Sequence, residues 1–551
     1  MTLAVGRQSK ISSDREGFFM HVGKQSDDRR LVLGVIFLTV SNLLTKICGM
    51  FLKVPLTNTL GDSGMAYFNL AYAVYKWFYM ISTAGLPVAA AVLTAQYASN
   101  AIGDERCAIL RRVRNVTLLA FLMLGLIGGL CMYFGAPLFA GLQKVPEGAS
   151  SIAAIAPALF CICIASALRG WYQGLECQLP TAIAQVAEAV GKMVCGLWFA
   201  AYAIDRGYPI SIVASWAAAG LSVGCLLGMA VMLISHPFVV RRFHITGDAS
   251  NAAVPIGTLL SKLWKIALPV TLSASVMSLC DMLDSMIVIR RMCGAGIAAE
   301  EALRLYGNYT ALAVPMFNLP PILIYPLTTA LIPVISAARA DQQRCQRIVL
   351  ASLSTAVMIA MPCSAGMCLL SEPILRLFYR ADLAAVGAPL LSALAPAVLF
   401  LSIFAMCNAI LQAIGEARYA LYAILLGAAV KLISDWCLTG TASISIMGSP
   451  ISTVLCYVSM AGCALWFVVL KTGASLNMGV MLCRPAAAAV VCAVTARAAY
   501  RVFAAHLPLT AGTMLSILIG GITYLAALMA LGGVNAEVLH LIFGRKRKVA
   551  S

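Results

Sequence analysis

Long apolar stretches, separated by short polar segments, follow one another along almost the whole chain of 551 residues. A helix needs about 20 mostly apolar residues to cross a bilayer, and each stretch is long enough for one crossing. Several stretches contain proline, for example Pro87, Pro320 and Pro326, so we expect some of these helices to be kinked or broken. The pattern predicts fourteen membrane spans, at 31–56, 64–94, 115–139, 150–170, 180–204, 209–235, 263–289, 306–336, 348–370, 385–411, 419–439, 443–470, 480–503 and 508–532.

The composition excludes most classes of soluble protein. Hydrophobic residues make up 61% of the chain and charged residues 11%, against roughly 25% charged in an average soluble domain. A soluble fold needs more polar residues than this to cover its surface. The 19 cysteines are scattered through apolar stretches without a CxxC motif or metal-ligand spacing. They are typical of small buried apolar side chains, and we expect no metal site and no cofactor.

The basic residues predict how the chain is oriented. An even number of spans places both termini on one side of the membrane. Of the 39 Lys and Arg residues, far more fall in tails and loops on that side than on the other. The positive-inside rule therefore predicts a multi-pass plasma-membrane protein with both termini in the cytoplasm. Residues 1–30 and 533–551 are expected to be basic cytoplasmic tails, and the run from Arg545 to Lys548 suits lipid head groups rather than nucleic acid.

A weak internal repeat connects the two halves of the chain. At an offset of 239 residues, Asn69 matches Asn308 and Lys192 matches Lys431. The offset covers six spans, so the two halves have the same orientation, a plan shared by many secondary transporters. We expect an all-α fold with two parallel six-helix bundles. The expected units are a first lobe at 31–235, a cytoplasmic linker at 236–262, a second lobe at 263–470 and an extra helix pair within 471–532.

Ionisable residues inside the expected spans are the candidate functional residues. A charge at the middle of a membrane costs roughly 3 kcal/mol or more, so such residues usually face a polar cavity or a charged partner. The seven that we select as candidates are Lys46, Lys53, Lys76, Glu188, Lys192, Asp281 and Asp284.

Each candidate also has a purely structural interpretation. Glu188 and Lys192 are four residues apart on one helix and can neutralise each other, as can Lys431 and Asp435. Lys53 lies near the outer end of its span, where it could extend its ammonium group toward the interface. The two aspartates on the seventh span, at 281 and 284, are either a cation or proton site or partners for lysines across a cleft, and the sequence does not separate these.

A run of small residues in the sixth span has a structural interpretation. Gly220, Gly224 and Gly228 are spaced four apart, which is typical of helices that pack at close range in membranes. We predict close helix packing here rather than ligand contact.

Four segments resemble one known family. LTKICGMFLKVPL at 44–56, followed by LGDSG at 60–64, LRGWYQGLECQLPTAIAQVAE at 168–188, the segment 72–87 ending in STAGLP, and 305–336 are similar to the stage V sporulation protein B group. That group belongs to the multidrug/oligosaccharidyl-lipid/polysaccharide (MOP) exporter superfamily, together with MurJ-type lipid II flippases. The resemblance covers about 31–470.

The resemblance implies a transporter of the bacterial cell (plasma) membrane rather than an enzyme. The implied cargo is a polyprenyl-diphosphate-linked saccharide, with lipid II as the leading candidate, moved by alternating access in cell-wall or spore-cortex synthesis. Lys46, Lys53 and Lys76 resemble the basic residues that MurJ-type members carry on their first two helices. Residues 311–318 lack the basic residue expected near the start of the eighth helix, which favours the sporulation branch or another lipid-linked sugar. Expected partners are the lipid-linked sugar, membrane lipids and, as a further option, cell-wall synthesis proteins.

Two other functions stay open at this point. A cation-coupled multidrug (MATE-type) exporter would use Asp281 and Asp284 for H⁺ or Na⁺. A non-transporting scaffold would have no need for charges inside its spans. Three lysines in the first two spans favour an anionic cargo over cationic drugs.

Overall fold

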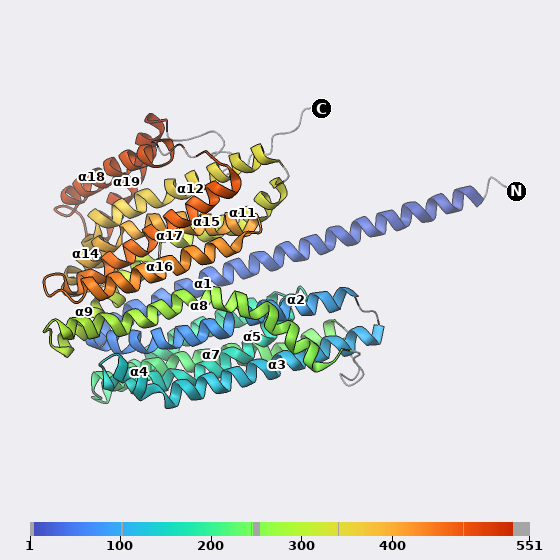
Figure 1. The fold of residues 1–551 in the computed structure, drawn as a ribbon, viewed down its shortest axis with the longest axis horizontal. Helices are drawn as coiled ribbons and strands as arrows, with labels where there is room; N and C mark the ends of the chain where they lie inside the picture. The colour runs from blue at the N-terminus through green and yellow to red at the C-terminus, as the bar shows by residue number, and fades with distance from the viewer. Residues whose placement is uncertain are drawn as a thin grey trace.

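The computed structural model describes residues 5–100, 103–243, 245, 254–339, 341–475, 477 and 479–532. Every regular element in these ranges is a helix (Figure 1), which confirms the predicted all-α plan. The expected tail at 533–551, with its basic run, lies outside the described residues, as does the start of the tail at 1–30.

The first helix is much longer than its predicted span. α1 covers Val5–Thr83, and Gly61 breaks it with φ 67° and ψ −165°, a conformation that glycine adopts without steric cost. The chain reverses direction at this break. The reversal brings the ammonium group of Lys53, before the break, over the ring of Tyr72, after it. The backbone of 5–30, expected as a tail, is helical and continuous with the span, and Figure 1 shows it projecting away from the other helices.

The number of spans agrees with the prediction once the breaks are considered. Eleven helices in the described part are long and apolar enough to cross a membrane, or thirteen if two bent pairs each count as one span. One of the eleven, Val40–Ala98, is 59 residues long and contains the Gly61 break. Counting this helix as two spans raises the total from thirteen to fourteen. One bent pair, Ala299–Phe317 with Pro321–Thr328, turns by 49°, where Pro320 predicted a break.

The helices of the first half of the chain pack mainly with one another. Those of the second half do the same, except that α8 and α9 also pack extensively on the first half. Figure 1 shows the two groups side by side, with α8 and α9 between them. The first half comprises α1, α2 (Gly85–Asn100), α3 (Gly103–Phe134), α4 (Ala136–Leu142), α5 (Ala149–Gly174), α6 (Leu179–Asp205) and α7 (Ile210–Arg242). The second half comprises α8 (Ile256–Gly294), α9 (Ala299–Asn308), η3 (Tyr309–Ala313), α10 (Val314–Phe317), α11 (Pro321–Ala338), α12 (Gln342–Leu369), α13 (Ser371–Arg376), α14 (Ala381–Leu394), α15 (Pro396–Ala413), α16 (Ala417–Leu438) and α17 (Gly448–Thr472).

The last two helices form a pair beside the second half. α18 (Arg484–Phe503) and α19 (Leu509–Ala530) pack on each other and on α12. The hydroxyl of Tyr524 donates to the backbone carbonyl of Met358, 2.9 Å away. This pair occupies the chain segment where the sequence predicts an appended pair.

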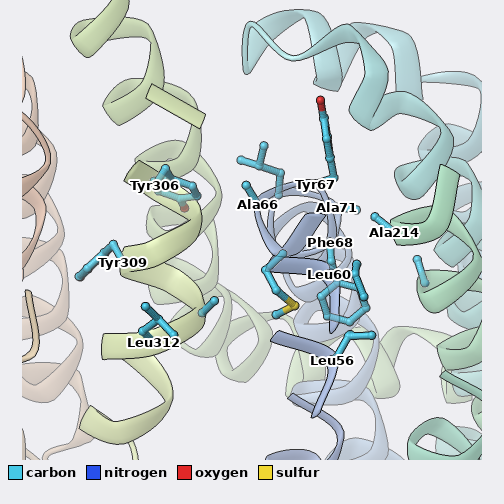
Figure 2. Packing of buried hydrophobic residues seen from close by; sticks show 14 of the residues in the cluster. Leu56, Leu60, Ala66, Tyr67, Phe68, Ala71, Ala214, Tyr306, Tyr309 and Leu312 are labelled. Atoms are coloured by element: carbon cyan, nitrogen blue, oxygen red, sulfur yellow. The ribbon is translucent and has the colours of Figure 1, made fainter. Parts of the chain in front are cut away.

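The two halves meet near the α1 break. Figure 2 shows Leu56, Leu60 and Phe68 of α1 packed in one apolar cluster that also includes Tyr306 and Leu312 of the second half. The backbones of the two halves approach closely at Gly307. A Cβ atom added to this glycine would lie only 2.2 Å from a backbone carbonyl oxygen of α1. The contact therefore closes the space between the halves at the end of the bundle where α1 turns.

Candidate functional site

A cavity of about 350 Å³ lies between the two halves of the chain. Its described lining comes from α1 on one side and from α8, α9, η3, α10, α14, α16 and α17 on the other. Five charged residues line it, namely Lys53, Lys76, Asp281, Asp284 and Lys431. We call it the central cavity.

One ion pair joins the two halves inside this cavity. The ammonium group of Lys76 on α1 lies 2.5 Å from a carboxylate oxygen of Asp281 on α8, and the two side chains are 43% and 38% exposed. Close by, Asn69 donates to the hydroxyl of Thr310 across the same interface. Asp281 is thus paired with a lysine across the interface, which is one of the two arrangements that the sequence left open.

A second ionic cluster lies within the second half and is almost completely buried. Lys431 on α16 donates to Asp284 at 2.9 Å, to Asp435 at 3.1 Å and to the hydroxyl of Thr453 at 3.3 Å. The hydroxyl of Ser452 donates to the other oxygen of Asp435. The exposed fractions are 6% for Lys431, 8% for Asp284 and 0% for Asp435. One cation therefore serves two carboxylates, and the cluster carries an excess of one negative charge if all three groups are ionised.

The first half contains a cavity of its own, with a volume of about 290 Å³. It lies among α1, α5, α6 and α7 and extends along α1 from Asn42 to Lys53. At 1.5 Å per residue, those eleven steps cover about 16 Å of helix. Lys53 and Tyr72 line both cavities. We call this second cavity the first-half pocket.

An ion pair on α6 forms the polar side of the first-half pocket. Lys192 lies 2.6 Å from Glu188, one turn before it, so the predicted pair is confirmed. Arg169 on α5 lies 3.9 Å from the same carboxylate, and its Nε atom is buried without a hydrogen-bond partner among the described residues. The guanidinium group is therefore weakly satisfied by the protein.

The small residues of α7 hold this ion pair in place. A Cβ atom at Gly224 would lie 2.4 Å from backbone and side-chain atoms of Lys192, and one at Gly228 would lie 2.9 Å from Glu188. Close packing at the run of glycines is thus confirmed. It brings α7 against the turn of α6 that carries both charged side chains.

The two other candidate lysines of α1 are held by aromatic rings. Lys53 is half-buried, with its ammonium group 5.6 Å from the centre of the Tyr72 ring, and it makes no salt bridge with any residue that the structure describes. Lys46 is exposed and lies 4.9 Å from the centre of the Tyr325 ring. It is not among the described residues that line either cavity.

Sequence reasoning missed two members of these clusters. Arg169 lies inside the segment 168–188 that carries the family resemblance, near the end of a predicted span, and its position in a membrane helix was the available signal. Lys431 was recognised only as a partner of Asp435. Its bond to Asp284 joins residues 147 apart in the chain, which no local pattern shows.

Comparison with known proteins places the chain in a family. A family model described as polysaccharide biosynthesis protein matches residues 31–339, and a second, described as MatE, matches residues 308–437. Stage V sporulation protein B of Bacillus subtilis is 26% identical over 434 residues, which cover 76% of this chain and 80% of that protein. The lipid II flippase MurJ of Bacillus subtilis is 24% identical over 479 residues, covering 83% and 85%.

A solved structure shares the fold. It shows a lipid II flippase MurJ in an inward closed conformation, with a TM-score of 0.66 and 15% identity, and the match covers 93% of this chain and 100% of that one. The first family model matches more than half of the chain. The chain therefore belongs to the polysaccharide biosynthesis protein family and is a multi-pass membrane transporter of the MOP superfamily.

Proposed function

We propose that the protein is a flippase that moves a polyprenyl-diphosphate-linked saccharide across the membrane by alternating access. A lipid II-like cell-wall or spore-cortex precursor is the first cargo to test. The relatives named for a lipid II flippase and for sporulation support this choice. The two halves of the chain would act as two lobes that open alternately to each side.

The observation that carries the proposal is the set of lysines around the central cavity. Lys53 lines it without a salt bridge to any described residue, and Lys76 lines it in a pair that is about 40% exposed. A diphosphate has to cross the hydrocarbon layer with its charge covered. Lysine contacts phosphate as a point charge with little geometric demand, which suits a cargo that moves.

The ion pair between the halves suits a contact that has to break in each cycle. A partly exposed pair contributes only about 0–1 kcal/mol, so an anionic cargo can replace Asp281 as the partner of Lys76. The central cavity, at about 350 Å³, is near the lower limit for small-molecule sites. A saccharide head group would therefore enter after the halves move apart.

We further propose that Asp281 and Asp284 couple the cycle to an ion or to the membrane potential. Protonation or cation binding at Asp281 would weaken its attraction to Lys76 and favour opening. An Asp281→Asn/Asp284→Asn variant should then lose the dependence of transport on ion gradient or voltage. Wild-type dependence in that variant would mean that the coupling site lies elsewhere.

The function is tested by reconstitution in liposomes. Purified protein should move fluorescent lipid II, or another fluorescent polyprenyl-diphosphate saccharide, to the opposite leaflet faster than protein-free liposomes do. A cationic dye should not be transported. Transport of the dye without transport of either lipid would support the multidrug exporter instead, and movement of none of the three would contradict transport of this cargo class.

A further inference from the structure

The first-half pocket has a charge balance that differs from every other polar site described above. Three cationic side chains line it, namely Lys53, Arg169 and Lys192, against one carboxylate, Glu188. That carboxylate is held at 2.6 Å by Lys192 and lies 3.9 Å from Arg169. With all four groups ionised, the described lining has an excess of two positive charges.

Such an excess requires a partner in this environment. Glu188, Lys192 and Arg169 are only 12%, 21% and 14% exposed, and charges taken out of water are stable only when they are paired or hydrogen-bonded. Arg169 offers five N–H donors. Its ion pair is with a single carboxylate oxygen of Glu188 at 3.9 Å, and its Nε atom is buried without a hydrogen-bond partner among the described residues. The guanidinium group is therefore available to an anion.

We propose that this pocket is a diphosphate-binding site in which Arg169 is the principal ligand. A diphosphate that bridges a lipid and a sugar carries two negative charges near neutral pH, which equals the excess on the lining. The planar guanidinium group suits bidentate contact with phosphate oxygens, and Lys192 and Lys53 add point charges. Tyr72 and Tyr79 also line the pocket, and a tyrosine hydroxyl group can donate to remaining phosphate oxygens.

The shape of the pocket gives the site a place in the transport cycle. The pocket follows α1 for about 16 Å and ends at Lys53, which also lines the central cavity. A diphosphate held at Arg169 could thus pass to the central cavity while remaining in contact with Lys53. The identity of the cargo in this inference rests on the proposed function. The binding of a diphosphate by the lining residues does not depend on it.

The test is a binding measurement that needs no transport. Inorganic pyrophosphate is titrated into protein in phosphatidylcholine nanodiscs, and affinity is followed by isothermal titration calorimetry. Arg169→Gln should weaken pyrophosphate binding by about 10-fold to 100-fold, as expected for loss of a charge-assisted hydrogen bond. Glu188→Gln should act in the opposite direction and tighten binding by about 3-fold to 10-fold, since it removes the competing carboxylate.

Controls separate a ligand role from a folding role. Arg497→Gln removes an arginine of α18 that lies outside both described linings and donates to a backbone carbonyl, and it should leave the affinity unchanged. Arg169→Lys keeps the charge and should lose only about 2-fold to 5-fold. If Arg169→Gln does not fold, the opposite shifts of Glu188→Gln and Arg169→Lys still decide the question.

The outcomes distinguish this inference from the proposed function. Unchanged affinity in Arg169→Gln, or weaker binding in Glu188→Gln, would overturn the diphosphate site even if fluorescent lipid II is transported. Pyrophosphate binding that depends on Arg169 without lipid transport would leave the site in place and contradict the proposed function. Loss of pyrophosphate binding in phosphatidylglycerol nanodiscs would assign the pocket to anionic phospholipid head groups and overturn its assignment to the cargo.

Discussion

Lys192 and Lys431 occupy matching positions in the two halves of the chain, but their surroundings differ in charge. Lys192 is paired with one carboxylate, and Arg169 and Lys53 line the same pocket. Lys431 is enclosed by two carboxylates and a hydroxyl group, with 6% of its side chain exposed. With all groups ionised, the first site has an excess of positive charge and the second has an excess of negative charge.

The difference shows how one intramembrane lysine can serve two purposes. A lysine surrounded by its own carboxylates is a structural element, because removing it leaves buried charges without a partner. A lysine beside other cations is not fully neutralised by carboxylates, so it can still attract an anionic ligand. The number of carboxylates around each lysine therefore predicts which half binds an anion and which half holds its helices together.

The largest effect is expected at the buried cluster. Lys431→Ala would leave the carboxylates of Asp284 and Asp435 buried without their cation, and should destabilise the protein by about 3–5 kcal/mol. The measurement is the thermal or denaturant unfolding of purified protein in detergent micelles. Lys192→Ala is the matched variant in the first half. It leaves Glu188 beside Arg169, so the cost should be much smaller, and equal losses in both variants would remove the distinction between the halves.

The next effect concerns the packing that positions the ion pair of the first half. Gly224→Ala would force a methyl group to within about 2.4 Å of Lys192, and overpacking of this kind typically costs about 1–3 kcal/mol. We expect lower stability and weaker pyrophosphate binding together. Gly462→Ala on α17 is the control, since a Cβ atom there meets nothing within 4 Å. A harmless Gly224→Ala would mean that α6 and α7 separate easily.

The sequence predicted much of this arrangement, and the parts that it missed are the long-range ones. Apolar length predicted the spans, and the spacing of Glu188 and Lys192 predicted their pair, because both are properties of a single helix. The break at Gly61 falls in the gap between the predicted spans 31–56 and 64–94, so it was contained in the apolar pattern as well. The bond between Lys431 and Asp284 depends on how helices meet, and no local pattern contained it. The charge excess of the first-half pocket required Arg169 of α5 and Lys53 of α1 to be brought together by the fold.

A smaller effect is expected at the contact between the halves. Asp281→Asn would remove the charge that holds Lys76, and a pair with this much exposure contributes about 0–1 kcal/mol. The balance between closed and open states should shift by up to about 5-fold toward open. Distances between spin labels on the two halves, measured by double electron–electron resonance, would report the shift. A distribution identical to that of the wild-type protein would show that this pair does not hold the halves together.

The smallest effect should be at Lys46. Its ammonium group lies over Tyr325, outside the described lining of both cavities, and an exposed contact of this kind contributes about 0.5–1 kcal/mol. Lys46→Ala should reduce the rate of lipid transport less than Lys53→Ala does. Equal losses would support the sequence-based prediction that Lys46 binds cargo, and would extend the anion site beyond the first-half pocket.

The most direct measurement of the charge difference is to locate a bound oxyanion. Tungstate is electron-dense and carries two negative charges, so cryo-electron microscopy of the protein with tungstate can show where such an ion binds. We predict density in the first-half pocket, in contact with Arg169 and within reach of Lys192 and Lys53, and none beside Lys431. Density beside Lys431, or an empty first-half pocket at saturating tungstate, would contradict the account.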